Sequence, residues 1–131
     1  MMLKEVADYL AASGIGLTYD TNLFINHIPG GPAVADSIVC LYEYAGSPPS
    51  KSSPAIENPG LQVVARGLDP VTVRTMMESI EDKLCTVANQ TLGSTRFLII
   101  EPLGAAFGMG TENKRCKFAQ NYRVMRARSD V

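Results

Sequence analysis

The chain has 131 residues, of which 46% are hydrophobic and 19% charged, values typical of one soluble globular domain spanning residues 1–131. No apolar run approaches the roughly 20 residues of a membrane span, and no leader pattern precedes the first helix pattern, so we expect neither membrane association nor secretion. Three widely spaced cysteines and a single histidine argue against a zinc site. We therefore expect free thiols, no metal and no cofactor.

The first part of the chain predicts one helix followed by two strands. Apolar residues recur at helical spacing over residues 2–13, and Gly14 suits the left-handed position after a helix end. Strands are expected over residues 22–28 and 37–44 from their β-branched and aromatic content. Residues 45–58 are rich in proline, glycine and serine, which predicts a long loop.

The second part predicts one helix and further strands. Asp69 and Pro70 are a favoured N-cap and first helical residue, and apolar residues at helical spacing follow them as far as Asn89. Strands are expected over residues 60–66, 95–101 and 117–125, with a less regular one over 105–109. Residues 126–131 are expected to form a mobile tail.

This order, α-β-β-β-α-β-β-β, predicts an α+β fold: a mainly antiparallel sheet of about five to six strands with two helices packed on one face. Two helices of this width can shelter roughly four strands. Two strands nevertheless look apolar on both faces. The opposed pairs are Val39 and Leu41 against Cys40 and Tyr42, and Leu98 and Ile100 against Phe97 and Ile99. Either a neighbouring subunit covers the second face, or the long loops fold back over it.

Charge is unevenly distributed along the chain, although the net charge is only −1. Half of the basic residues lie near the C-terminus: Lys114, Arg115, Lys117, Arg123, Arg126 and Arg128. A basic end on a more acidic body suits a head-to-tail contact between identical subunits or a surface that faces a polyanion. The alternative is a solvated strand end. Direct nucleic-acid recognition is not favoured, because a stacking platform of Phe118 and Tyr122 also needs a positive groove and the net charge is slightly negative.

No catalytic constellation is evident. His27 is the single histidine, and no serine lies in a nucleophile elbow. Glu78 and Asp82 are spaced to bind a cation, but we favour a solvated helix face as their explanation. The glycines around Met109 match no phosphate-binding loop and suit a bulge or turn. We expect no enzymatic activity, and the alternative is a small cytosolic enzyme that uses His27 or a cysteine.

Several short segments, taken in their order along the chain, resemble those of a known family. They are Val6-Ala7-Asp8-Tyr9-Leu10 with Gly14-Ile15-Gly16; Val39 to Gly46 with Pro48-Pro49; Asn58-Pro59-Gly60-Leu61-Gln62-Val63 with Arg66-Gly67; Asn89 to Gly93; and Arg96-Phe97. With these segments, the chain resembles the minor capsid or tail terminator family of long-tailed (siphovirus-type) bacteriophages and prophages of Gram-positive bacteria.

The resemblance implies a structural virion protein with an α+β fold and no catalysis or cofactor. Such a protein forms a hexameric ring that caps the tail tube, stops its polymerisation and provides the head-tail joining surface. Its partners would be copies of itself, the tail tube protein and a head-tail connector or completion protein. DNA would pass through the lumen without sequence-specific binding. The resemblance places such a protein in the neck of the virion, assembled in the host bacterial cytoplasm. Another neck component, such as a head completion or connector protein, is the alternative.

The residues that we expect to serve assembly lie in three regions of the chain. They are Tyr42, Glu43 and Tyr44 at a strand end; Pro48, Pro49 and Lys51 in the long loop; and Arg66, Lys117 and Arg123 on later strands. Aromatic and arginine side chains are the types most often found at the centre of interfaces.

Overall fold

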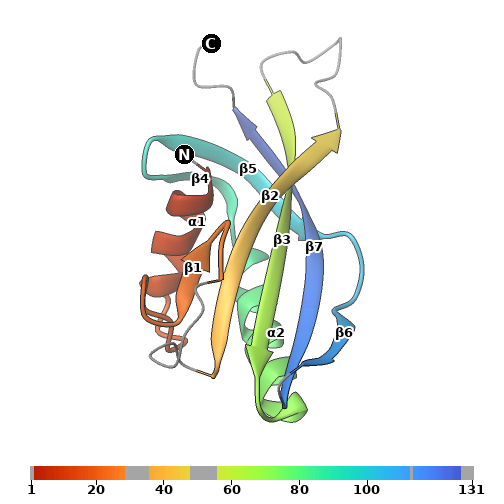
Figure 1. Cartoon of the computed structure of the whole chain (residues 1–131). Helices are drawn as coiled ribbons and strands as arrows, with labels where there is room; N and C mark the ends of the chain where they lie inside the picture. Colours follow the sequence, from red (N-terminus) through yellow and green to blue (C-terminus); the bar gives the residue numbers. More distant parts are fainter. Residues whose placement is uncertain (1, 29–35, 48–55, 113, 128–131) are drawn as a thin grey trace.

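A computed structural model of the chain describes residues 2–28, 36–47, 56–112 and 114–127. The elements are α1 (Met2–Ala11), β1 (Leu23–Ile25), β2 (Ile38–Ser47), β3 (Ile56–Gly67), α2 (Pro70–Leu84), β4 (Ala88–Leu92), β5 (Thr95–Pro102), β6 (Phe107–Glu112) and β7 (Arg115–Ala127). Figure 1 shows the long, curved strands β2, β3 and β7 beside the two helices. Within the described ranges, no helix is long and apolar enough to cross a membrane.

The strands form one mixed sheet in the order β1-β2-β3-β7-β5-β4. β1 runs parallel to β2, whereas the other described pairings are antiparallel. The sheet is therefore mixed, and the expectation of a mainly antiparallel sheet is corrected by the parallel strand β1. β3 occupies one edge of β7, so β5 and β6 lie end to end along its other edge. The strand expected over residues 105–109 is present as β6, but it begins at Phe107 and extends to Glu112.

Both helices pack on one face of this sheet, as the sequence predicts (Figure 1). The apolar stripes of the helices are buried with the alternate residues of the central strands, because a helix buries one side and a strand every second residue. The buried helical residues are Leu3, Val6, Ala7 and Leu10 of α1, and Val73, Met77, Ile80 and Leu84 of α2. Asp69 caps α2 by accepting a hydrogen bond from the backbone N–H of Val71 at 3.2 Å.

The end of α2 differs from the expectation. The helix stops at Leu84 rather than near Asn89, and an unexpected strand, β4, follows at once. Val87 continues the apolar stripe and is fully buried, but it lies beyond the helix. Asn89 has a φ of 49°, a left-handed conformation that an α-helix cannot contain.

The long loop and the tail are both shorter than expected. β2 extends to Ser47, β3 begins at Ile56, and Arg126 and Ala127 belong to β7. The first strand is also shorter and ends at Ile25, because Asn26 turns the chain with a φ of 60°. The rest of the predicted loop and tail lies outside the described residues.

The second apolar face of β2 is closed by the chain itself. Ile38 and Cys40 are buried there against Phe24 of β1, and Ile28 and Tyr42 pack around them. The expectation that a neighbouring subunit must cover this part of β2 is therefore not needed, because the chain already shelters Cys40 completely.

An irregularity in β5 alters the predicted faces of that strand. The register with β7 shifts between Phe97 and Ile99, which places Phe97 and Ile100 together in the core. Leu98 and Ile99 are only half-buried. The strict alternation expected from the sequence fails here because a bulge adds one residue to a strand and reverses the faces beyond it.

The break between β5 and β6 is held by Gln120 of β7. Its amide nitrogen donates to the carbonyl oxygen of Gly104 at 2.9 Å and to the carboxylate of Glu81 at 2.8 Å. The Tyr122 hydroxyl donates to the Gln120 amide oxygen at 3.1 Å. These buried bonds tie α2 to the break, so the start of β6 has a defined position relative to the core.

A buried carboxylate joins α1 to the β4–β5 turn. Glu5 accepts hydrogen bonds from the Ser94 backbone N–H at 2.8 Å and from the Thr95 hydroxyl at 2.5 Å. Gly93 turns the chain beside it with a φ of 61°, where an added Cβ would lie 2.7 Å from the carboxylate. Burial acts to raise the pKa of Glu5, but the hydrogen bonds from Thr95 and Ser94 outweigh it, so the pKa lies below its ordinary value.

We expect Glu5→Gln to lower the free energy of unfolding at pH 7 by about 1–3 kcal/mol, because charge-assisted hydrogen bonds are lost. A folded-state pKa below the unfolded value adds stability above the unfolded pKa and loses it as pH falls through the folded pKa. The difference between variant and wild type should therefore shrink below about pH 4.5, the ordinary value of this carboxyl. Urea unfolding from pH 3 to pH 7 measures it, with the exposed Glu78→Gln as control. A constant difference across this range would contradict the assignment.

Candidate assembly surface

The sheet has one face that carries no helix, which we call the helix-free face. Strand alternation and the β2–β3–β7 register assign its residues: Ile38, Cys40, Tyr42 and Tyr44 of β2; Gln62, Val64 and Arg66 of β3; and Lys117, Ala119, Asn121 and Arg123 of β7. Polar and apolar side chains therefore share this face. Gln62 donates to Asn121 at 3.0 Å in its middle.

Two of the expected assembly residues meet at one end of the helix-free face. Tyr44, Gly60 and Arg123 are registered side by side on β2, β3 and β7. A Cβ at position 60 would overlap the Tyr44 ring, so glycine lets this ring lie flat across the sheet. The register thus brings together two residues that are far apart in the sequence.

A shallow hollow of about 240 Å³ lies between these side chains and Leu103. The Leu103 side chain is 61% exposed and Tyr44 is 37% exposed, so large apolar groups reach solvent here. Arg123 forms an ion pair with Glu101 of β5 and remains half-exposed. The hollow combines an aromatic ring, an aliphatic side chain and a charged pair, which is the composition of protein interfaces rather than of enclosed ligand pockets.

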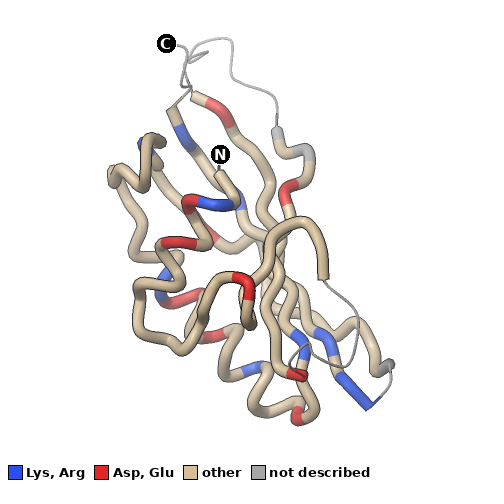
Figure 2. Tube along the Cα trace, turned by 60° about the vertical axis from the view of Figure 1, so that its left-hand side comes forward, with Lys and Arg blue, Asp and Glu red and all other residues tan. Residues whose placement is uncertain are grey.

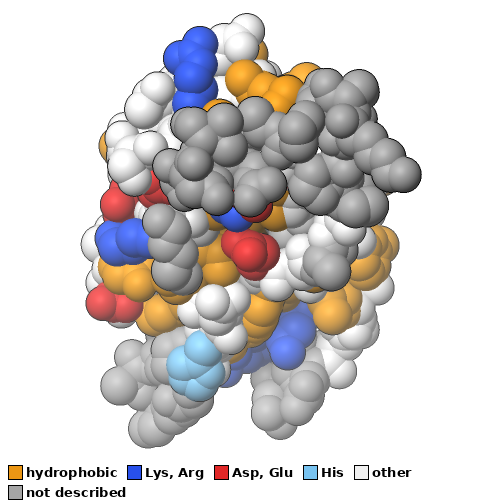
Figure 3. All heavy atoms as spheres, turned by 90° about the horizontal axis from the view of Figure 1, so that it is seen from above, with side chains coloured by type: hydrophobic (Ala, Val, Ile, Leu, Met, Phe, Trp, Pro, Cys, Tyr) orange, Lys and Arg blue, Asp and Glu red, His pale blue; other side chains and the backbone are white. Residues whose placement is uncertain are grey.

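Three of the basic residues near the C-terminus are paired with carboxylates in the fold. Arg115 pairs with Asp36 at 2.7 Å, Arg126 contacts Glu57 at 3.5 Å, and Arg123 pairs with Glu101. Figure 2 shows basic positions at both ends of the molecule rather than in one stripe. From the end where the termini lie, hydrophobic side chains and charges of both signs are interspersed (Figure 3). The basic residues near the C-terminus are therefore divided between the two ends of the molecule.

Arg66 and Lys117 are registered together at the opposite end of the helix-free face. The Nε of Arg66 donates to the backbone oxygen of Asp36 at 3.5 Å. Burial, together with the nearby Arg115, lowers the pKa of Arg66, and Asp36 partly offsets the effect. Because the side chain is 91% buried within the chain, Arg66 has less surface to offer a partner than its residue type suggests.

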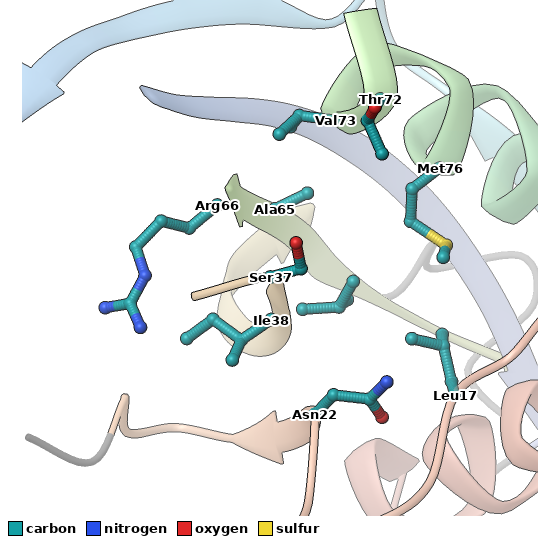
Figure 4. A pocket seen from close by; sticks show the side chains of 10 residues that line it. Leu17, Asn22, Ser37, Ile38, Ala65, Arg66, Thr72, Val73 and Met76 are labelled. Carbon is teal, nitrogen blue, oxygen red and sulfur yellow. The ribbon is translucent and has the colours of Figure 1, made fainter. Parts of the chain in front are cut away.

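A small apolar hollow lies between this end and α2, lined by Leu17, Val73 and Met76 among others (Figure 4). The Arg66 guanidinium points away from these side chains (Figure 4). The volume of this hollow, about 70 Å³, is well below the roughly 300 Å³ of the smallest common ligand sites. The hollow fits a packing defect better than a cofactor site.

The thiols and the histidine do not form a nucleophilic pair in the described structure. The three cysteines are free, as expected, and His27 is exposed. Burial raises the pKa of the Cys40 thiol, and burial together with the nearby acidic residues of α2 raises that of Cys85. A raised pKa disfavours the reactive thiolate. Across the described ranges, no group of acidic, histidine and cysteine residues is placed to hold a metal ion.

The six expected assembly residues that the structure describes do not form one patch. Tyr44 lies with Arg123 at one end of the helix-free face, and Arg66 lies with Lys117 at the other. Glu43 is exposed, but strand alternation places it on the other face. Pro48, Pro49 and Lys51 lie outside the described residues.

Tyr42 packs mainly inside the chain. Its half-buried ring lies against the cluster of Phe24, Ile38 and Cys40. Burial, with a contribution from Cys40, raises the pKa of Tyr42 to about 12. Tyr42 is thus a weaker candidate for contact with a partner than Tyr44.

Sequence reasoning missed Leu103, Gly60 and Glu101 at this surface. Leu103 stands alone between a proline and a glycine, so it belongs to no periodic pattern. An apolar residue in a break between strands is not expected to reach the core, and this position could have indicated that Leu103 is exposed. Gly60 and Glu101 gain their roles only from the register of β3, β7 and β5.

No family model and no curated protein matches the sequence. Among solved structures, the chain is similar to a chain in the virion of a native gene transfer agent (GTA) particle, with a TM-score of 0.63 and 16% sequence identity. The match covers 94% of this chain and 84% of that chain. At this identity, the likeness shows a shared fold over nearly the whole domain.

We expect Gly60→Ala to destabilise the protein by about 1–3 kcal/mol, because the new methyl group displaces the Tyr44 ring. In a Tyr44→Ala background the same change should cost much less, since alanine suits a strand better than glycine. Urea unfolding of the four proteins measures this coupling. Gly104→Ala, where a Cβ meets nothing within 4 Å, is the control. Equal costs in both backgrounds would show that the ring does not depend on Gly60.

Proposed function

We propose that this protein is a structural component of a phage-type virion, and more specifically a tail terminator that caps the tail tube as a ring. The observation that carries the proposal is the shared fold with a chain of a gene transfer agent virion over 94% of this sequence. The family resemblance of the ordered motifs supports the finer assignment.

The chemistry of the described surface is consistent with an assembly role. Tyr44 and Leu103 are exposed apolar groups beside the Arg123–Glu101 pair. Tyrosine and arginine contribute large, orientable contacts to interfaces. The small hollows and the raised thiol pKa values give an enzymatic role no comparable support.

In this proposal, the protein stops tube polymerisation and offers the opposite side of its ring to a head-tail connector or completion protein. It joins the particle at the neck, after assembly in the host bacterial cytoplasm. The DNA passes through the lumen without sequence-specific contacts.

The direct test adds the purified chain to polymerising tail tubes and follows tube length by negative-stain electron microscopy. A terminator shortens the tubes and appears as a ring at one end, and the ring stays on tails purified without heads. A chain that binds heads or connectors but leaves tube length unchanged would instead be another neck component. A chain that binds neither would refute the virion role.

We expect Arg123→Glu to weaken ring formation or tube capping by on the order of tenfold, about 1.4 kcal/mol. The new carboxylate repels Glu101, and the substitution removes a cation that lines the hollow. The fold should persist, since a half-exposed ion pair contributes less than about 1 kcal/mol. Arg74→Glu, exposed on the helix layer, is the matched charge control. Unchanged assembly and tube capping would remove Arg123 from the interface.

A further inference from the structure

The edge of β6 is an unusual feature of this sheet. In the described structure β6 pairs with β7 alone, so its other edge presents unpaired backbone groups. Phe107 is 45% exposed and Met109 is 52% exposed on this strand. Its sequence carries neither a lysine nor a proline, the residues that usually protect an edge strand from pairing.

A second open edge lies diagonally across the sheet. β1 pairs only with Val39, Cys40 and Leu41 of β2. The upper part of β2, from Tyr42 to Gly46, therefore has β3 on one side and no described strand on the other. The outermost strands β1 and β4 are short, at three and five residues, and most of β4 is polar and exposed.

We propose that β6 of one subunit pairs with the Tyr42–Gly46 stretch of β2 in a second copy of this chain, which makes the sheet continuous between subunits. This inference rests on the proposed function, because it identifies the contact that would close the ring. The two edges differ, so the contact is heterologous, and repeated copies can close into a ring.

Strand direction supports the pairing. β2, β3, β7 and β6 alternate in direction across the sheet. A rotation about an axis along the strands preserves direction, so the β2 of the next subunit runs antiparallel to β6. Each subunit would then contribute four strands to an uninterrupted antiparallel succession.

The offset between the two edges, measured along the strand direction, also fits a closed sheet. Through the register, Phe107 lies level with Ala119, Val64 and Cys40, which is four residues below Tyr44. The offset to Tyr44 is about 13 Å from Phe107, the first residue of β6, and about 20 Å from the middle of the strand, against about 19 Å for four strand spacings. Their ratio corresponds to a strand tilt of about 35–45°, the range in which closed barrels are built.

Burial of apolar side chains favours a second copy as the occupant. Phe107 and Met109 are exposed on β6, and Tyr44 is exposed within the β2 stretch. Pairing of the two edges removes these side chains from solvent, which is the main driving force for association.

The first experiment replaces the two apolar residues with edge-protecting lysines. We expect Phe107→Lys/Met109→Lys to raise the protein concentration needed for ring assembly by on the order of tenfold or more. Sedimentation velocity and native mass spectrometry measure the assembly. Val71→Lys, at a helix residue that is 71% exposed, is the matched control and should assemble as wild type. Circular dichroism checks that each variant is folded.

The second experiment reads the contact without disrupting it. Tyr44→Cys and Met109→Cys are combined in a Cys85→Ser background, where the remaining thiols at Cys40 and Cys116 are buried. A short bismaleimide should join the double variant into a ladder of multimers on a denaturing gel. Each single variant has one accessible thiol and should give dimers at most.

The outcomes separate this inference from the proposed function. If the wild type forms rings or caps tubes while the double-lysine variant does so equally and the thiols give no ladder, the β6–β2 contact is wrong and the terminator role stands. If the wild type stays monomeric, alone and on tail tubes, both are overturned. A ladder together with impaired assembly of the double-lysine variant establishes the contact.

Discussion

The register between β3 and β7 is the constraint on which the core and the helix-free face both depend. These two long strands pair from Ile56 and Ala127 to Gly67 and Cys116. In this register Leu61 lies beside Tyr122 on the helix side, and Gly60 lies beside Arg123 on the other. A slip of one residue would turn the core residues of one strand to the opposite face, which is why the core enforces this alignment. The position of Arg123 at the surface hollow follows from the packing beneath it.

Sequence patterns predict the features of the fold that depend on residues close together in the chain. The apolar stripe of α1, the Asp69 cap of α2 and the alternation of Tyr122, Arg123 and Val124 are all present in the structure. The strand β4 escaped prediction because its residues are mostly polar and exposed, so only its pairing with β5 gives it extended structure. The ion pairs of Arg115, Arg123 and Arg126 escaped it too. Each partner is distant in sequence, so the basic stretch alone does not show which of its charges are paired.

The proposed oligomerisation needs a physical cause other than the unsheltered apolar face that the sequence suggests. The sequence points to an unsheltered apolar face on β2, but Phe24 and Ile28 already cover Ile38 and Cys40. What the fold leaves incomplete is the hydrogen bonding along its edges. An edge strand costs little when water solvates its backbone, so an open edge permits association without demanding it.

The distribution of side chains among the strand edges distinguishes an edge kept for pairing from one that is merely exposed. β4 displays polar groups such as Asn89 and Gln90, and β1, with three residues, is too short to form a long pairing with another strand. β6 instead exposes Phe107 and Met109 beside two glycines, a composition that invites aggregation unless a specific partner covers it. Its register shift between Gly108 and Thr111 bends the strand, which restricts the partners that can align with it. Selectivity for one edge geometry would therefore let the same exposed residues favour ring closure over disordered association.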